Sequence, residues 1–288
     1  MSNTPRDNGS GESATGLGVN STGAGKVSDA RDARVHPAFS LTAEDILSLT
    51  VSLPEEYASA IRERPEVFLE LLRSFDGIDA DALLLVDKGH LLSSDYVPGD
   101  IVELKRFGGR LVLNKDSLAL RGVVLPDLFA MVVAARQDGV ILDLSSTYRS
   151  HTYQTGLFQY WVDQLGLEEA ERVSARPGSS QHQLGTTIDF GSITDDFAEH
   201  PAGRWLAEHA WKYGFSLSYP RGWEEQTGYS YEPWHFRWIS RPATYMEREF
   251  FGGIQQKMLE YLYENRSKFE AAADRSALHP DSSSEIIF

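Results

Sequence analysis

The chain has 288 residues, of which 41% are hydrophobic and 11% aromatic, so it can bury a sizeable core within one or two domains. Its 42 acidic and 27 basic residues give a formal charge of −15, which argues against nucleic acid or an anionic membrane surface as a partner. The sequence contains no cysteine, which excludes disulfides, thiol nucleophiles and Cys-ligated zinc. Any metal must therefore bind through His, Asp or Glu.

The first segment, residues 1–36, is dominated by Gly, Ser, Asn, Thr and Asp, and no aromatic residue precedes Phe39. Such a segment buries too little surface to offset chain entropy, so we predict a disordered tether. No apolar run approaches the ~20 residues of a membrane helix. The N-terminus also lacks the basic and apolar regions of a signal peptide, so the sequence itself predicts no membrane span.

Helical periodicity begins at Thr42, which forms a candidate capping box with Asp45, and two or three short helices are expected over residues 42–76. We define residues 37–80 as a helical N-terminal extension. The run Leu83-Leu84-Leu85-Val86 predicts a buried strand.

Beyond this point helices and strands follow without regular alternation. The expected helices cover about 126–137, 151–165, 201–213 and 243–273, and the expected strands cover 140–144, 186–190, 215–219 and 234–239. This pattern favours an α+β fold with a small, mostly antiparallel sheet flanked by helices. We predict a central domain over residues 81–242, followed by a C-terminal helix and a frayed tail over 243–288.

The first stretch with chemical character runs from Ser180 to Phe190 and contains His182 and Asp189 on either side of Gly185. In an extended strand Asp189 faces a cleft while its two neighbours face the core, and the glycine lets the chain turn so that His182 returns to the same cleft. Taken alone, a loop histidine and a strand aspartate are more often hydrogen-bonding groups than metal ligands.

The second stretch, Glu232-Pro233-Trp234-His235, places a histidine in an aromatic strand with a carboxylate three residues earlier. In a regular strand Glu232 and His235 face opposite sides, but Pro233 constrains the bend between them and can bring both into one cleft. The alternative is an aromatic core strand with an edge glutamate.

Together the two stretches supply His182, Asp189 and His235, a three-ligand set that leaves a fourth tetrahedral position for water, as catalytic zinc requires. Glu232 remains available as a base. A zinc ion held by two neutral imidazoles and one carboxylate lowers the pKa of its water and polarises a peptide carbonyl, so the chemistry is hydrolysis of an acyl bond. Arg149, at a strand end, can stabilise the oxyanion, although a lone arginine is a surface charge by default.

The ordered motifs SxHxxGxxxD and ExxH, the second in the context EPWH, resemble the zinc D-alanyl-D-alanine carboxypeptidases related to VanY. These form the M15 peptidase family, whose fold is shared with the dipeptidase VanX and the Hedgehog signalling domain. The resemblance covers roughly residues 81–240, including similar stretches at 83–104, 145–154 and 205–238. Thr187 departs from the family pattern, which usually has alanine at this position.

The resemblance implies a role for each residue. One zinc ion per chain is bound by His182, Asp189 and His235, Glu232 is the general base and acid, and Arg149 steadies the tetrahedral intermediate. Ser180 and Gln154 help to hold the substrate, and Trp234 walls the cleft; Ser180 could also only shape its loop, and Trp234 could be core. The implied substrate is a peptidoglycan stem peptide or precursor ending in D-Ala-D-Ala, cleaved in the cell envelope, either periplasmic or extracytoplasmic.

Related activities remain open alternatives. These are a peptidoglycan L,D-carboxypeptidase, a dipeptidase, an endopeptidase, or a non-catalytic binding module that keeps the fold and the zinc. The presence of both Glu232 and Arg149 favours an enzyme over the binding module. The helices outside the motif region are expected to be packing extensions.

Overall fold

The computed structural model describes residues 34–273, so most of the expected tether and the expected tail lie outside the described residues. Residues 34–36, assigned to the tether, instead form strand β1 (Arg34–His36), which pairs antiparallel with β2 (Phe39–Thr42). His36 Nε2 lies 2.9 Å from Glu70 Oε2, which ties the hairpin to the helices that follow. The prediction was wrong here because a three-residue strand whose one apolar residue is Val35 carries little hydrophobic signal.

Three short helices follow, as the sequence predicts: α1 (Ala43–Thr50), α2 (Glu55–Glu63) and α3 (Pro65–Arg73). Thr42 Oγ1 accepts a hydrogen bond from the Asp45 backbone N at 3.2 Å, and Asp45 Oδ2 accepts one from the Thr42 backbone N at 2.8 Å. The predicted capping box is therefore confirmed.

The single C-terminal helix expected over 243–273 is instead two helices, α9 (Arg241–Phe250) and α10 (Gln255–Ala272). The chain breaks between them at Gly252 and Gly253, whose φ angles are 62° and 77°. Residues other than glycine rarely adopt these positive φ angles, so the glycine pair ends one helix and redirects the chain into the next.

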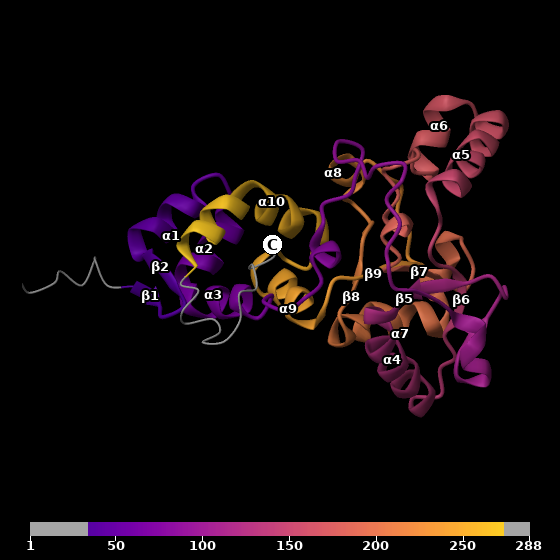
Figure 1. Cartoon of the computed structure of the whole chain (residues 1–288), viewed down its shortest axis with the longest axis horizontal. Helices are drawn as coiled ribbons and strands as arrows, with labels where there is room; N and C mark the ends of the chain where they lie inside the picture. Colours follow the sequence, from indigo (N-terminus) through magenta and orange to yellow (C-terminus); the bar gives the residue numbers. More distant parts are fainter. Residues whose placement is uncertain (1–33, 274–288) are drawn as a thin grey trace, which may run out of the picture.

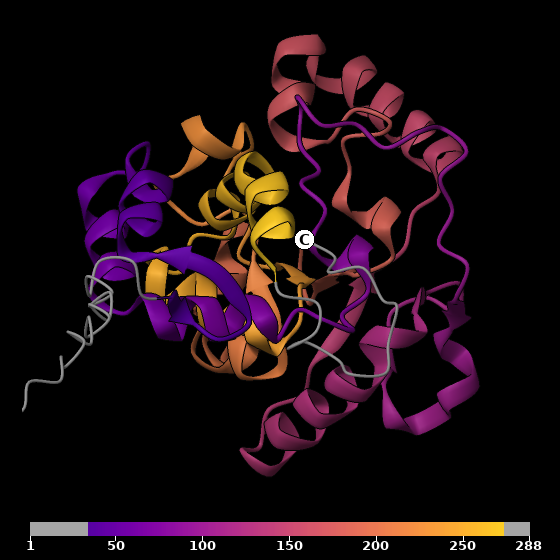
Figure 2. The ribbon, with the colours of Figure 1, turned by 60° about the vertical axis from the view of Figure 1, so that its left-hand side comes forward.

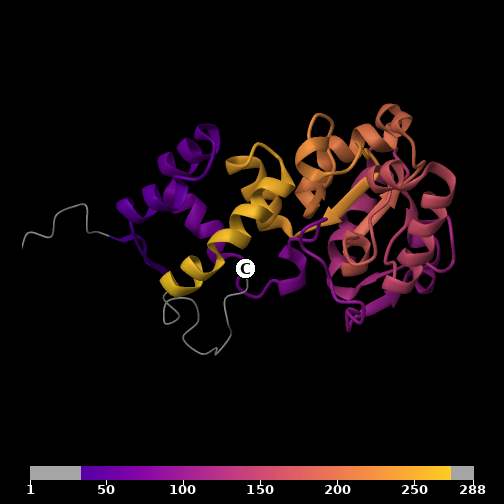
Figure 3. The same cartoon turned by 90° about the horizontal axis from the view of Figure 1, so that it is seen from above.

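The N-terminal and C-terminal helices share one hydrophobic core. Figures 1 and 3 show α1–α3 beside α9 and α10, at the opposite end of the molecule from the main sheet. Phe68 of α3 contacts Phe250 and Phe269, with ring centroids 5.3 and 6.1 Å apart. The buried residues of this cluster come from both ends of the described chain. We call this unit, residues 34–78 with 239–273, the helical lobe.

The central sheet has five strands in the order β4-β6-β7-β9-β8, and all neighbours are antiparallel except β4 and β6. The strands are β4 (Val112–Leu113), β6 (Asp143–Ser146), β7 (Thr187–Phe190), β8 (Phe215–Leu217) and β9 (His235–Trp238). With its helices, this small and mostly antiparallel sheet confirms the predicted α+β class.

One face of this sheet packs on helices α4 (Leu125–Gln137) and α7 (Pro201–His209), which lie together below it in Figure 1. Ile188, Phe190 and Phe236 from the sheet are buried in that core. Because side chains alternate along a strand, the residues between them face the opposite side, where the polar site lies.

The remaining elements lie around the sheet. Helices α5 (His151–Leu165) and α6 (Leu167–Val173) project from the end opposite α4 in Figures 1 and 2. The other elements are the antiparallel pair β3 (Ile101–Glu103) and β5 (Ala119–Arg121), the helix α8 (Glu224–Thr227), and the 3₁₀ turns η2 (Ala80–Leu83), η3 (Leu104–Arg110), η4 (Gly122–Val124), η5 (Gln181–Leu184), η6 (Asp195–Glu199) and η7 (Ala210–Tyr213). Within residues 34–273 no helix is long and apolar enough to cross a bilayer.

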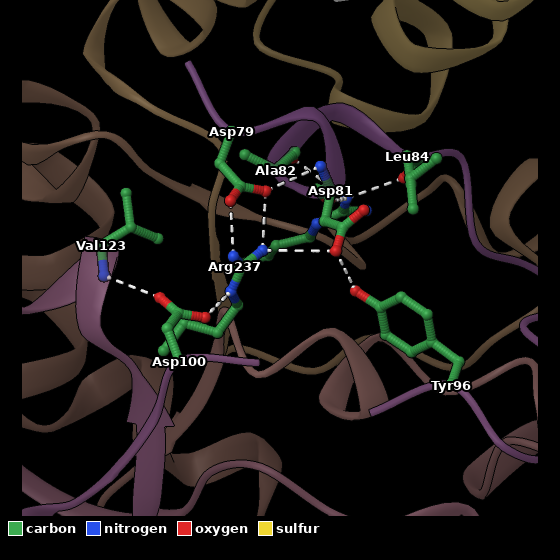
Figure 4. Close-up of polar contacts among 9 residues, drawn as sticks. Asp79, Asp81, Ala82, Leu84, Tyr96, Asp100, Val123 and Arg237 are labelled. Atoms are coloured by element: carbon green, nitrogen blue, oxygen red, sulfur yellow. Dashed lines mark hydrogen bonds and ion pairs between the residues drawn. The ribbon is translucent and has the colours of Figure 1, made fainter. Parts of the chain in front are cut away.

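The strand predicted over residues 83–86 is not formed. The chain makes the 3₁₀ turn η2 and then continues without regular structure. The carbonyl oxygens of Ala82 and Leu84 accept hydrogen bonds from Arg237 Nη2, at 3.1 and 2.7 Å, in place of bonds from a neighbouring strand (Figure 4). Leu83, Leu85 and Val86 are buried as predicted and Leu84 is half-buried, but the backbone here is satisfied by a side chain and not by a strand.

An acidic cluster joins the chain that leaves the helical lobe to the β3–β5 pair. Arg121 of β5 donates to Asp100 Oδ1 at 2.6 Å and to Asp79 Oδ1 at 2.7 Å, and Asp81 lies beside them. Figure 4 shows the three aspartates around the guanidinium group that they share. The backbone N of Arg121 donates to the carbonyl of Gly185 at 2.9 Å, so the same residue supports the turn that precedes β7.

Candidate metal centre and active site

Adjacent strands bring two of the predicted ligands together. Asp189 of β7 and His235 of β9 are directly paired across the antiparallel ladder. Paired residues project from the same face of a sheet, so both side chains enter the polar side. His182 comes from η5 and reaches them because Gly185, at φ 70°, turns the chain back into β7.

The three ligands form one compact, buried cluster. One ligand atom from each of His182, Asp189 and His235 lies within 4.8 Å of the others, and the residues are 2%, 2% and 4% exposed. His182 Nε2 lies 3.2 Å from Asp189 Oδ2, and His235 Nδ1 lies 3.1 Å from Asp189 Oδ1. In the described chain this is the one group of three such residues spaced to hold a metal ion.

The second nitrogen of each imidazole has its own partner. His182 Nδ1 lies 2.7 Å from the carbonyl oxygen of Thr147, which can only accept, so this nitrogen carries the proton. His235 Nε2 lies 3.2 Å from Gln181 Oε1. In neutral rings these contacts leave His182 Nε2 and His235 Nδ1 free to ligate, and both face Asp189.

The pKa values describe a site that attracts a cation. Burial lowers the pKa of His182 to about 4, so the ring is neutral and able to ligate. Burial opposes ionisation of Asp189, but His182 and Arg149 hold its pKa well below the usual value. Burial also opposes the charge on His235, yet Asp189 and Glu232 raise its pKa to about 9. Carboxylates that favour a protonated ring also favour a bound metal cation.

Glu232 enters the same site by means of a turn. Pro233 and Trp234 form the turn, which is closed by a hydrogen bond from the His235 backbone N to the Glu232 carbonyl at 3.1 Å. Glu232 Oε2 lies 3.3 Å from His235 Nδ1, so both side chains share one cleft as the proline bend suggested. Burial raises the pKa of Glu232, partly offset by His235, which suits a group that must both take and release a proton.

Arg149 lies on the other side of the aspartate. Its Nη2 donates to Asp189 Oδ2 at 2.6 Å, and its Nε donates to Ser146 Oγ at 2.9 Å. The Arg149 backbone N donates to the His182 carbonyl at 3.2 Å. These contacts hold the guanidinium at the cleft, where it can stabilise negative charge.

A single pocket includes almost all of the predicted residues. It is lined by both histidines, both carboxylates and Arg149, and also by Ser180 and Trp234. Trp234 is also part of the hydrophobic core between the sheet and helices α4 and α7, so it both lines the pocket and packs in the core. Gln154 is not among the lining residues. It is buried on α5, and its Nε2 donates to the Ala175 carbonyl at 2.8 Å, which anchors the helix beside the pocket.

Several lining residues were not predicted. Tyr219 packs on His235 with ring centroids 4.7 Å apart, and Tyr229 packs on Tyr219 at 4.8 Å. Gln181 also lines the pocket. Its position next to His182 in the sequence could have indicated that Gln181 belongs to the site. The two tyrosines lie on segments that approach the site only in the folded chain, so no local pattern indicates them.

Comparison with known proteins identifies the family. Residues 117–241 match the family model of VanY, D-alanyl-D-alanine carboxypeptidase. YodJ of Bacillus subtilis (strain 168) is 32% identical over 184 residues, which cover 60% of this chain and 67% of that protein. The bifunctional D-Ala-D-Ala dipeptidase and carboxypeptidase VanXYC of Enterococcus gallinarum is 31% identical over 172 residues, 56% of this chain and 85% of that protein. The chain belongs to the VanY family.

The similarity extends to solved structures. The LdcB LD-carboxypeptidase superposes with a TM-score of 0.57 at 28% identity, covering 64% of this chain and 88% of that one. VanYB in complex with D-alanine-D-alanine has a TM-score of 0.52 at 27% identity, covering 62% of this chain and 97% of that one. A VanY D,D-pentapeptidase in complex with Zn(II) has a TM-score of 0.52 at 26% identity, with coverage of 62% and 99%.

The VanY-like site of this chain fits zinc. Two imidazole nitrogens and one carboxylate are a donor set that zinc prefers, and they leave a position for water or substrate. Asp189 Oδ1 is buried and faces His235 Nδ1 at 3.1 Å, and with that nitrogen unprotonated no hydrogen bond joins the two, so a cation would satisfy both atoms. The Thr147 carbonyl and Gln181 fix both rings in the orientation that ligation needs.

Proposed function

We propose that the chain is a zinc carboxypeptidase that removes the terminal D-Ala from peptidoglycan peptides ending in D-Ala-D-Ala. The observation that carries this proposal is the convergence of three metal ligands, a buried glutamate and an arginine in one pocket of a VanY-family protein. Each of these groups has a separate task in hydrolysis of an amide bond.

His182, Asp189 and His235 hold the metal. When bound, zinc supplies Lewis-acid activation of water and of the scissile carbonyl. Glu232 takes a proton from the attacking water and delivers it to the nitrogen of the departing D-alanine as the C–N bond breaks. Its burial and its position 3.3 Å from His235 support this double role.

Arg149 stabilises the negative charge that develops on the carbonyl oxygen. Two of its nitrogens are held by Ser146 and Asp189, so the guanidinium is oriented before substrate arrives. Ser180 and Trp234 contact the peptide from the pocket wall, and Gln154 acts on the substrate only through the position of α5.

The proposed substrate is a stem peptide or precursor of peptidoglycan, and the proposed place of action is the cell envelope, outside the cytoplasm. The similarity to VanYB in complex with D-alanine-D-alanine and the match to the D-alanyl-D-alanine carboxypeptidase family support this choice of substrate. The similarity to LdcB makes an L,D cut the alternative to exclude.

Product analysis tests the function directly. Mass spectrometry should show loss of one alanine from a pentapeptide ending in D-Ala-D-Ala, and a metal chelator should abolish that loss. A tetrapeptide with an L,D terminal bond, free D-Ala-D-Ala and a pentapeptide blocked at its carboxyl end serve as comparison substrates. Preferred cleavage of the tetrapeptide would replace the D,D assignment with an L,D one, and cleavage of the blocked peptide at an internal bond would indicate an endopeptidase.

A further inference from the structure

Gln255, the first residue of α10, lies in the helical lobe and outside the segment that matches the VanY family model. Its side chain is 1% exposed and extends toward the back of the metal site. Gln255 Oε1 lies 3.3 Å from Gln181 Nε2 and 3.3 Å from Ser218 Oγ. A residue of the C-terminal helices therefore contacts the residue that holds a metal ligand.

The contact matters because Gln181 has two ways to orient its amide. With Nε2 donated to Gln255, the Gln181 oxygen faces His235 Nε2 at 3.2 Å and also accepts from Ser218 Oγ at 2.7 Å. An oxygen at this place requires the proton of the neutral ring on Nε2, which leaves Nδ1 unprotonated toward Asp189.

The reversed amide would have the opposite effect. The NH₂ group of Gln181 would then face His235 and favour the ring with an unprotonated Nε2 and a proton on Nδ1. That form presents an N–H to the metal position and cannot ligate there. In the structure Gln255 turns its oxygen toward both Gln181 Nε2 and Ser218 Oγ, and with this orientation a turned Gln181 amide would bring two oxygens, Gln181 Oε1 and Gln255 Oε1, together.

We propose that Gln255 is a positioning residue for the metal: it orients the Gln181 amide so that His235 presents an unprotonated Nδ1 to zinc. The inference rests on the metal site of the proposed function and extends it to the helical lobe. Hydrogen-bonding partners of metal ligands raise affinity by fixing the tautomer and the ring orientation, and their loss typically lowers affinity by about 10–100-fold.

The test measures zinc affinity by competition with a chromophoric chelator in the full chain. Gln255→Met keeps the length of the side chain and removes the acceptor, so zinc affinity should fall by about tenfold, the lower end of the loss that follows removal of a ligand's own hydrogen-bonding partner. Gln256→Met is the matched control, because Gln256 is also buried on α10 but donates to Asp87 and Glu260. The control should keep the wild-type affinity.

A second variant provides a rescue. Gln181→Glu has only acceptor atoms, so it needs no partner to choose its orientation. Combined with Gln255→Met, it should restore zinc affinity to within a few-fold of wild type. The visible absorption of the cobalt(II)-loaded protein, which reports ligand geometry, should change in Gln255→Met and return in the double variant.

The outcomes separate this inference from the proposed function. If Gln255→Met is folded and binds zinc as tightly as wild type, with an unchanged cobalt spectrum, the positioning role is wrong. Should that variant fail to fold, Gln255→Asn retracts the amide by one methylene and is expected to show the same loss of affinity. A wild-type protein that binds no zinc would instead overturn the proposed function, and this inference with it.

Discussion

The carbonyl oxygen of Thr147 lies 2.7 Å from His182 Nδ1, whereas the other histidine of the site, His235, meets its supporting acceptor through Nε2. The two rings therefore face Asp189 with different nitrogens, and their planes are nearly perpendicular at 89°. Each ring is fixed by an acceptor from a different part of the chain. The geometry predicts a preformed metal site.

Loss of both imidazoles should remove the metal. In the variant His182→Ala/His235→Ala, Asp189 is the one remaining ligand of the three. A single carboxylate is too few ligands to retain zinc. Atomic absorption after dialysis should show about one zinc per wild-type chain and close to none in the variant. His209→Ala is the control, because this ring stacks on Trp205 and lies outside the pocket. Full zinc occupancy in the double variant would refute the assignment.

Glu232→Gln should separate chemistry from metal binding. The amide keeps the shape of the side chain but cannot accept a proton, so kcat should fall by roughly 10²-fold or more. Zinc content and KM should stay close to wild type because Glu232 is not a ligand. Steady-state kinetics with paired zinc analysis measures both quantities. Near wild-type turnover at full zinc would remove Glu232 from the mechanism and favour the non-catalytic binding module.

Arg149→Lys should affect the rate more than binding. Lysine keeps the charge but cannot bond Ser146 and Asp189 simultaneously with a planar fork, so the cation is no longer held at the oxyanion position. Oxyanion stabilisation should weaken by on the order of 2–3 kcal/mol, which corresponds to a fall in kcat of roughly 10²-fold. Arg176→Lys, at an exposed pair with Glu171, is the control. A kcat unchanged by Arg149→Lys would assign the arginine to support of Asp189 alone.

Much of the site could be predicted from the sequence because its determinants are local. Gly185 between His182 and Asp189, and Pro233 between Glu232 and His235, are short-range signals for turns, and each turn forms as expected. The alternation within β7 was also sufficient to place Asp189 on the polar face.

Other features depend on contacts between distant segments. The run 83–86 reads as a strand, but its backbone is satisfied by Arg237, which no local pattern indicates. The shared core of the helical lobe and the approach of Gln255 to Gln181 join residues that are far apart in the sequence. Gly252 and Gly253 were visible in the sequence, but the helical periodicity on both sides concealed the break that they make.

The last prediction concerns Glu247, a carboxylate of α9 that is 5% exposed. Burial raises its pKa from 4.5 to about 8, although Ser216 and the charge of Arg248 offset part of this effect. Among residues 34–273, its Oε2 has no hydrogen-bond partner. At neutral pH the folded protein therefore keeps this group protonated, whereas the unfolded chain ionises it.

The sign of the pH dependence follows from linkage. Below about pH 4.5 both states are protonated, so the stability associated with this group is fully present. Between 4.5 and about 8 the folded state binds the extra proton, so the free energy of unfolding falls as pH rises, by up to about 1.4 kcal/mol per pH unit. Glu247→Gln removes this loss, and its stability relative to wild type should increase from pH 5 to pH 8 by on the order of 3 kcal/mol. Urea denaturation of the chelator-treated proteins measures it, with the exposed Glu264→Gln as control. A stability difference between Glu247→Gln and wild type that is independent of pH would show that Glu247 ionises normally in the folded protein.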